Sequence, residues 1–193
     1  MEVFETIGKR HSYRGDFTSQ PIPREDLKKI VQAGIQAPSG CNAQTTSFVI
    51  VDDPALIRQI GDIVDKPVAR KAQAIILCIV EHRPVYQKWS FGVEDCAAAV
   101  ENILLAITAL GYATVWIDGA LIVEVRAWKI AKIAKVPDNR EVRVLLPVGV
   151  PTEIVQQRER HDFSTRAWFN EFGTDRQPGD GVLCLENSNT AIC

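Results

Sequence analysis

The chain has 193 residues, with 22 lysines and arginines against 24 aspartates and glutamates, so its formal net charge is −2. A slightly acidic chain lacks the basic surface that nucleic-acid binding needs, so we expect no nucleic-acid partner. Apolar residues make up 46% of the chain and charged residues 24%, which is ordinary for a globular domain that buries its own core.

Membrane, secreted and metal-dependent classes are also disfavoured. The longest apolar run, residues 103–112, is too short to cross a bilayer, and the first residues have no signal-peptide pattern. Five cysteines without a CxxC pair fit a reducing cytosol better than a disulfide framework. The three histidines are not at metal-ligand spacing. We therefore expect a cytoplasmic protein with no membrane partner and no metal.

The hydrophobic pattern predicts helices alternating with strands. A short helix comes first, and a second begins after Pro23 and ends before Pro38. The later helices are expected at 54–64, after an Asp53 N-cap, at 94–110 and at 122–134, and the strands at 46–51, 74–80, 115–117 and 143–150. This order indicates a mixed α/β or α+β layer fold.

The 94–110 helix is unusual because apolar residues surround most of its circumference. A helix that is apolar nearly all round must be buried nearly all round. In a domain of this size, we expect it at the centre of the fold or at a subunit interface.

The chain changes composition at its end. We expect one domain over residues 1–172 and a tail over 173–193 that is rich in glycine, aspartate and asparagine. The tail is either a disordered or tag-like segment or an arm on a partner subunit, and its apolar patch at 182–185 gives the second alternative some weight.

A basic stretch near the start is the first candidate site. If residues 10–14 are extended, Arg10, Ser12 and Arg14 share a face, because alternate residues of a strand do. Two guanidinium groups beside a hydroxyl suit a phosphate. The alternative is a solvated basic surface.

The loop from Ala37 to Gln44 is the second candidate. Ser39, Asn42 and Gln44 offer paired donors and acceptors, which match a ring edge that presents both N–H and C=O, as a flavin's pyrimidine edge does. A common helix C-terminal turn explains the same residues. Cys41 has no histidine nearby in the sequence, so we interpret it as a loop thiol rather than a nucleophile.

Two later segments add weaker signals. The predicted strand at 115–117 ends at Asp118–Gly119, where backbone can approach a ligand closely, although a tight turn explains this pattern equally. Arg158 and Arg160 either close over a phosphate or lie on the surface. The chain contains no GxGxxG, P-loop or GxSxG motif.

Taken in order, these segments resemble the nitroreductase family of FMN-dependent enzymes. The resemblance covers roughly residues 2–160 and is carried by residues 10–14, the 38–44 loop, the 101–111 helix end and the strand before Pro151. It implies an α+β fold, with helices flanking a central mixed or antiparallel sheet, and a domain-interlocked homodimer with FMN at the subunit interface.

The resemblance also implies roles for individual residues. The implied cofactor-binding set is Arg10, His11, Ser12, Arg14, Pro38, Ser39, Asn42, Gln44, Ile117, Asp118, Gly119, Arg158 and Arg160. In this reading Arg10 and Ser12 hold the phosphate and ribityl chain, and Arg14 lies near ring atom N1, where a positive charge stabilises the anionic reduced flavin. Pro38, Ser39 and Asn42 reach the flavin from the second subunit.

The sequence departs from the family pattern in two places. Thr45–Thr46 follow Gln44, where the family has proline and an aromatic residue, so the pocket wall differs there. The region before residue 94 is short, and we expect its aromatic residues Tyr86, Trp89 and Phe91 to form a small lid over the substrate.

The expected function is a ping-pong transfer of hydride from NADH or NADPH, through FMN, to a small electron-poor acceptor such as a nitroaromatic or quinone. No catalytic side chain is then required beyond the cofactor. The alternatives are a related flavin reaction, such as reductive dehalogenation or enone or flavin reduction, and a dimer that binds flavin without turnover.

Overall fold

The computed structural model describes residues 2–173 of the chain. Contacts within the chain divide it into two compact units, the first ending at Gln157 and the second beginning at Arg158. A 3₁₀ turn, Phe163–Thr165, is found in the second unit. The predicted tail and its apolar patch lie outside the described residues beyond Gly173.

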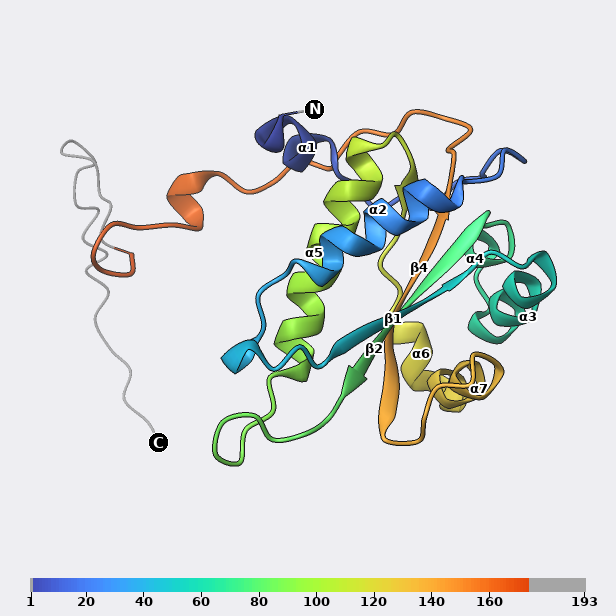
Figure 1. Ribbon diagram of the computed structural model, residues 1–193. Coiled ribbons are helices and arrows are strands. Elements are labelled where there is room, and N and C mark those ends of the chain that lie inside the picture. Colours follow the sequence, from blue (N-terminus) through green and yellow to red (C-terminus); the bar gives the residue numbers. More distant parts are fainter. Residues whose placement is uncertain (1, 174–193) are drawn as a thin grey trace, which may run out of the picture. The chain divides into compact units, whose positions relative to one another are not determined.

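Four antiparallel strands form the sheet of the first unit, in the order β1–β2–β4–β3. The strands are β1 (Thr46–Val51), β2 (Ala74–Glu81), β3 (Ala113–Thr114) and β4 (Arg140–Gly149). The helices are α1 (Val3–Lys9), α2 (Arg24–Ile35), α3 (Pro54–Val64), α4 (Pro67–Arg70), α5 (Gly92–Ala109), α6 (Gly119–Ile122) and α7 (Arg126–Ile133), with 3₁₀ turns η1 (Gly40–Asn42) and η2 (Val123–Val125). Helices on both faces of an antiparallel sheet confirm the predicted α+β class (Figure 1).

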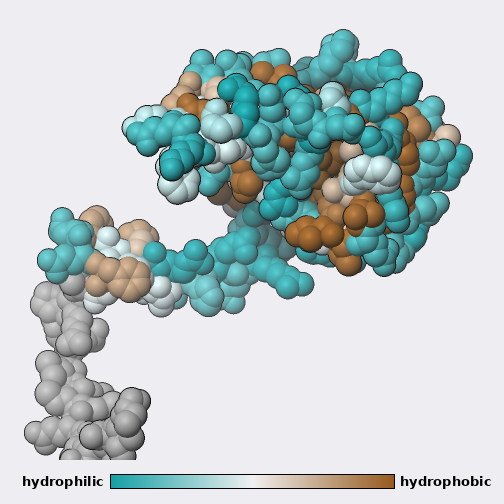
Figure 2. Space-filling view, turned by 90° about the horizontal axis from the view of Figure 1, so that it is seen from below, coloured by the Kyte–Doolittle hydropathy of each residue, from teal (hydrophilic) through white to brown (hydrophobic). Residues whose placement is uncertain are grey.

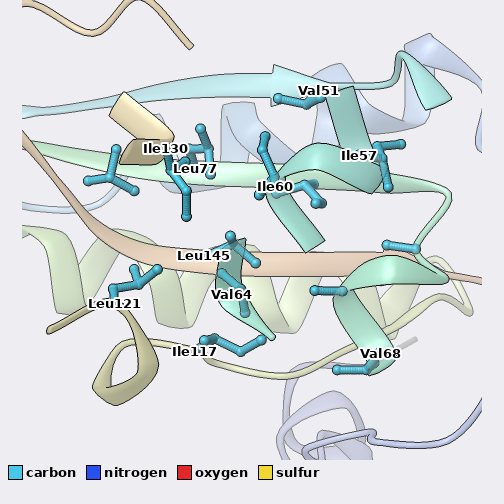
Figure 3. Close-up of a cluster of buried hydrophobic side chains, with 14 of the residues drawn as sticks. Val51, Ile57, Ile60, Val64, Val68, Leu77, Ile117, Leu121, Ile130 and Leu145 are labelled. Atoms are coloured by element: carbon cyan, nitrogen blue, oxygen red, sulfur yellow. The ribbon is translucent and has the colours of Figure 1, made fainter. Parts of the chain in front are cut away.

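Strand β2 is buried on both faces, which explains why its sequence is continuously apolar. Its residues alternate between two hydrophobic clusters, because successive side chains of a strand point to opposite faces. Ile76 and Cys78 belong to the cluster with α2 and α5. Ile75 and Leu77 belong to the cluster with α3, α6 and α7, whose side chains meet the sheet in Figure 3. Each fully buried aliphatic side chain contributes roughly 1.5–3 kcal/mol.

A β-bulge in β4 moves its side chains from one cluster to the other. Val144 pairs with Cys78, but Val142 pairs with Ile79, so Arg143 is the extra residue. Val142 consequently lies in the α3–α7 cluster and Val144 in the α2–α5 cluster, although they are two positions apart. The sequence predicts this strand from residue 143, at the bulge, whereas β4 begins three residues earlier, at Arg140.

The predicted helix over 122–134 is wrong in its first part. Helix α6 ends at Ile122, and the chain passes through η2 before α7 begins at Arg126. Glu124 and Val125 have φ values of 54° and 53°, which interrupt any helix. The strand predicted at 115–117 is also displaced: β3 ends at Thr114, and of the three residues only Ile117 forms a β-bridge, with Leu145.

Helix α5 is buried on one side only within the chain. Val100, Ile103 and Ile107 are fully buried, whereas Val93 is 46% exposed and Ala97 is also exposed. Ile35, the last residue of α2, is 54% exposed. Among residues 2–173, no helix combines the length and apolar character that a membrane span requires.

Candidate functional site

The segment after α1 is extended, and its residues alternate between core and surface. Tyr13 is fully buried, and its N–H donates to the carbonyl oxygen of Thr114 at 2.8 Å. Ser12 and Arg14 are exposed. The strand-like alternation that the sequence predicts is therefore present for these two residues, with Tyr13 fixing the segment to the sheet.

Arg10 and His11 have contacts inside the chain. Only 18% of the Arg10 side chain is exposed, and its Nε lies 3.4 Å from Oε1 of Glu101 in α5. His11 is half-buried, with Nδ1 2.9 Å from the carbonyl oxygen of Lys9. The Arg10 charge is thus partly neutralised by an acidic neighbour, while that of Arg14 is not.

Arg14 lines a cavity of about 380 Å³ in the first unit. The other lining residues are Lys66, Pro67, Val68 and the run Val115 to Ala120. The fold therefore brings the start of the chain, the α3–α4 connection and the segment after β3 to one place. Its walls are mainly apolar, its cations are Arg14 and Lys66, and Asp118 adds one carboxylate.

Within the described residues, neither the Arg14 nor the Lys66 side chain makes a hydrogen bond or ion pair. The carboxylate of Asp118, which accepts the Gly119 N–H, lines the same cavity and offsets part of this charge. One formal positive charge remains, which favours an anionic or electron-rich ligand over a neutral apolar one.

Lys66 did not stand out in the sequence. It follows Asp65, which ends α3 in the left-handed region at φ 56°, and precedes Pro67 at the start of α4. A lysine between two helices is common on a surface, so the sequence around Lys66 does not indicate a binding role. The structure places Lys66 in the turn between α3 and α4, at the edge of the cavity.

The segment after β3 contributes mainly walls and a helix start. Ile117 is 8% exposed, and its N–H and carbonyl oxygen both bond to Leu145, so its backbone groups are used within the sheet. Asp118 accepts the N–H of Gly119 at 2.6 Å and so caps α6. Gly119 has open space around the position of a Cβ atom.

The 38–44 loop borders a second, smaller cavity of about 50 Å³ beside α5. Pro38, Ser39 and Gln44 line it together. The Ser39 Oγ accepts the N–H of Gln44 at 3.0 Å, and the Asn42 N–H donates to the Ser39 carbonyl oxygen at 2.9 Å. Asn42 itself is exposed and is not among the lining residues. Pro38, Ser39 and Gln44 are thus brought together, and Asn42 is not.

Of the three aromatic residues predicted to form a lid, Phe91 packs on this loop. A Cβ atom on Gly40 would lie 2.4 Å from Cδ2 of Phe91, so the ring packs directly on the glycine. Tyr86 and Trp89 are 54% and 66% exposed and form a β-bridge with each other. Phe91 is therefore placed at the loop, while the other two aromatic rings face solvent.

Arg14 lines one cavity and Pro38, Ser39 and Gln44 line another, while Arg10, His11 and Ser12 are lining residues of neither. Helix α5 lies beside both Arg10 and the loop: Arg10 contacts Glu101, and the loop cavity includes Asp95, about 9 Å away along the axis at 1.5 Å per residue. Arg158 and Arg160 are exposed and belong to the second compact unit.

A third cavity, of about 350 Å³, lies between α6, α7 and β4. Two of its three cations are already paired: Lys132 with Asp138 at 2.5 Å, and Arg140 with Glu81 at 3.1 Å. Around it, Figure 2 shows hydrophobic residues gathered on the surface. The exposed ones in this segment are Ile122, Val123, Val125 and Trp128. Because most of its cations already have acidic partners, this third cavity is a weaker candidate for an anion than the Arg14 cavity.

The described cysteines do not form a nucleophilic centre with a base. Burial raises the pKa of the Cys78 thiol well above its ordinary value and that of Cys96 to about 11. Both thiols therefore stay protonated near neutral pH, which makes them poor nucleophiles. Cys41 is exposed in η1.

The regions that match known proteins include the segments described above. The model described as "Nitroreductase family" matches residues 7–75 and 64–150. A protein of Archaeoglobus fulgidus named "Putative NADH dehydrogenase/NAD(P)H nitroreductase" is 30% identical over 154 residues, which cover 79% of this chain and 87% of that protein.

Solved structures share the fold. A crystal structure from Bacteroides thetaiotaomicron that carries the same name has a TM-score of 0.76 and 25% identity, over 86% of this chain and 96% of that one. The structure of an FMN-dependent nitroreductase from Clostridium difficile has a TM-score of 0.75 and 23% identity, over 88% and 99%. Because the family model spans more than half of the sequence, the chain belongs to the nitroreductase family.

Proposed function

We propose that this protein is an FMN-dependent oxidoreductase that passes hydride from NADH or NADPH to a small electron-poor acceptor, such as a nitroaromatic or a quinone. Membership of the nitroreductase family supports an oxidoreductase. The Archaeoglobus relative is named as an NAD(P)H nitroreductase and the Clostridium protein as an FMN-dependent one, which supports this choice of reductant and cofactor.

The observation that carries the proposal is the convergence of Arg14 and Lys66. They approach one cavity from segments 52 positions apart, and neither side chain has a hydrogen-bond or ion-pair partner among the described residues. FMN combines an apolar ring system with electron-rich polar edges. The apolar walls of Val68, Val115 and Ile117 and the two cations match that combination, so the residues present fit the group.

Bound FMN would supply the hydride chemistry, which removes the need for a catalytic acid or base on the chain. The task of Arg14 and Lys66 is to hold positive charge against the ring edge, which favours an anionic form of the bound molecule over a neutral one. Phe91, packed on Gly40, limits water access on the side of the 38–44 loop.

We further propose that the active form is a homodimer. The loop residues and the Arg14 cavity are separate within one chain, so a second copy can bring another 38–44 loop to the flavin. The exposed apolar side of α5, with Val93 and Ala97, offers surface for such an interface. In this arrangement Ser12 and Arg10 of the first unit hold the phosphate.

The test begins with purified protein. We expect a yellow protein with a flavin spectrum, or an apoprotein that takes up FMN, and oxidation of NADH or NADPH when an acceptor is added. A panel of nitroaromatic, quinone, enone and halophenol acceptors distinguishes the reactions. A colourless protein that ignores added FMN would refute the proposal, and tight binding without turnover would leave only a flavin-binding dimer.

The cation pair has its own test. Arg14→Gln and Lys66→Gln should each weaken FMN binding about tenfold, and the double variant about a hundredfold, because each removes one bond to a charged group. Arg58→Gln on α3 is the matched control: it removes the same charge from an exposed side chain outside the cavity. Wild-type affinity in both single variants and in the double variant would contradict the assignment.

A further inference from the structure

A buried carboxylate ties together the two ends of the 38–45 loop. Asp95, in the first turn of α5, is only 5% exposed. Its Oδ1 accepts the backbone N–H of Gly40 at 2.8 Å, and its Oδ2 accepts the hydroxyl hydrogen of Thr45 at 2.9 Å. Both carboxylate oxygens thus bond to the loop.

The charge of Asp95 is tolerated because donors surround it. Burying a carboxylate is costly unless its oxygens are hydrogen-bonded, and here each one is. The first turn of the 18-residue helix α5 adds a favourable field, because the N-terminal end of a helix is partially positive. Gly40 and Thr45 are therefore held by charge-assisted bonds, which are stronger than neutral ones.

The loop needs this support because its own backbone is strained. Cys41, Asn42 and Gln44 have φ values of 52°, 52° and 51°, in the left-handed region that non-glycine residues adopt at a cost. Such conformations persist only when surrounding contacts hold them.

Other contacts fix the rest of the loop. An Arg83 guanidinium N–H donates to the Ala43 carbonyl oxygen at 3.0 Å, and the Glu81 N–H donates to the Thr45 carbonyl oxygen at 3.0 Å. These donors come from β2 and the segment after it, whereas Asp95 comes from α5. Within the loop the Ser39 Oγ also accepts the Gln44 N–H, and Asp95 is the α5 side chain that bonds to both Gly40 and Thr45.

We propose that Asp95 is a positioning residue: through Gly40 and Thr45 it holds the loop in the conformation that receives the flavin. The inference rests on the proposed function. Thr45 occupies a position at which the family pattern has proline. Because proline has no hydroxyl, the bond from this position to Asp95 depends on the threonine of this chain. The side chain acts through the loop and needs no contact with the flavin.

The test uses the full-length apoprotein and two measurements, hydrogen exchange of residues 38–45 and the dissociation constant for FMN. Thr45→Val keeps the shape but removes the hydroxyl bond to Asp95. We expect roughly tenfold faster exchange in the loop and roughly tenfold weaker FMN binding, since the competent loop conformation becomes less populated. Thr45→Ser restores the hydroxyl and should restore both values.

Thr114→Val is the matched control. Thr114 is 4% exposed, and within the described part of the chain its Oγ1 has no hydrogen-bond partner. This variant removes a buried hydroxyl outside the loop and should leave loop exchange and FMN affinity unchanged. If Thr45→Val folds poorly, Asp95→Asn gives a second test, because it keeps an oxygen for Gly40 but loses the charge.

The outcomes separate the two proposals. A wild-type protein that binds no FMN refutes the proposed function, while the exchange experiment still tests the contact. If wild type binds FMN and Thr45→Val binds it equally well, the positioning role is overturned, whether or not the loop exchanges faster. Loss of affinity that Thr45→Ser does not rescue overturns it as well.

Discussion

Replacing Gly40 by alanine tests whether the loop and the predicted lid are packed together as the structure has them. A Cβ atom there would lie 2.4 Å from Cδ2, 2.9 Å from Cγ and 3.0 Å from Cβ of Phe91. The last two atoms are close to the backbone, so the ring cannot move away without a change at Phe91 itself, the residue before α5. Overpacking of this kind costs about 1–3 kcal/mol.

The free energy of unfolding, measured by denaturant titration, should therefore fall by about 2 kcal/mol in Gly40→Ala. The corresponding drop in Tm is roughly 4–8 °C for a chain of this size. Gly8→Ala is the control, because a Cβ atom there meets nothing within 4 Å and alanine is the better residue in a helix.

A second substitution makes the reasoning refutable. Phe91→Ala removes Cγ and the ring and leaves only Cβ near the new methyl group, so adding it to Gly40→Ala should cost less than it costs in the wild-type background. If Gly40→Ala unfolds like wild type, or if the two substitutions simply add, the ring does not pack on Gly40 and the placement of Phe91 at the loop is wrong.

Two further predictions concern the N-cap of α3 and the ion pair between Arg24 of α2 and Asp52, which lies between β1 and α3. Asp53 accepts the N–H groups of Ala55 and Leu56 at 2.8 and 2.9 Å, so Asp53→Ala should lower the unfolding free energy by about 0.5–2 kcal/mol, while Asp53→Asn stays near wild type in the same titration. Hydrogen bonding by Arg24 lowers the pKa of the Asp52 carboxyl below its ordinary 3.8. Its contribution to stability is therefore present above pH 3.8 and lost as the pH falls through the lowered pKa; Asp52→Asn should remove this part of the acid dependence of Tm, and an unchanged acid profile would contradict it.

Elements with strong local signals were predicted closely. Strand β1 has the expected bounds, and Asp53 caps α3 as the Asp–Pro pair indicates. Gly111 follows α5 with a φ of 81°, the left-handed conformation that glycine allows after a helix. These features depend on a few neighbouring residues, so the sequence alone contains the relevant physics.

Elements that depend on distant contacts were predicted less well. Val125 takes a left-handed conformation that its β-branched side chain disfavours, so the break before α7 is held by packing rather than by propensity. The bulge at Arg143 exists only because β4 pairs with β2 in that register. No pattern in the neighbouring sequence predicts the break before α7 or the bulge in β4.

The candidate site divides in the same way. Ser39 and Gln44 stand out because a short polar loop between a helix and a strand is visible in the sequence, and their role stays a prediction. Lys66 and Asp95, which the structure leads us to propose, do not stand out: an inter-helix lysine and an acidic residue in a helix start are both ordinary in a sequence. Their significance comes from neighbours that are distant along the chain, Arg14 for one and Gly40 for the other.

The sequence by itself determined the helix and strand order, the family and the polar loops, because hydrophobic period, capping and turn chemistry act over a few residues. Only the tertiary structure decided which charges meet without a partner and which carboxylate is buried against a loop. Those properties depend on distance and desolvation, which arise when segments far apart in the chain pack together.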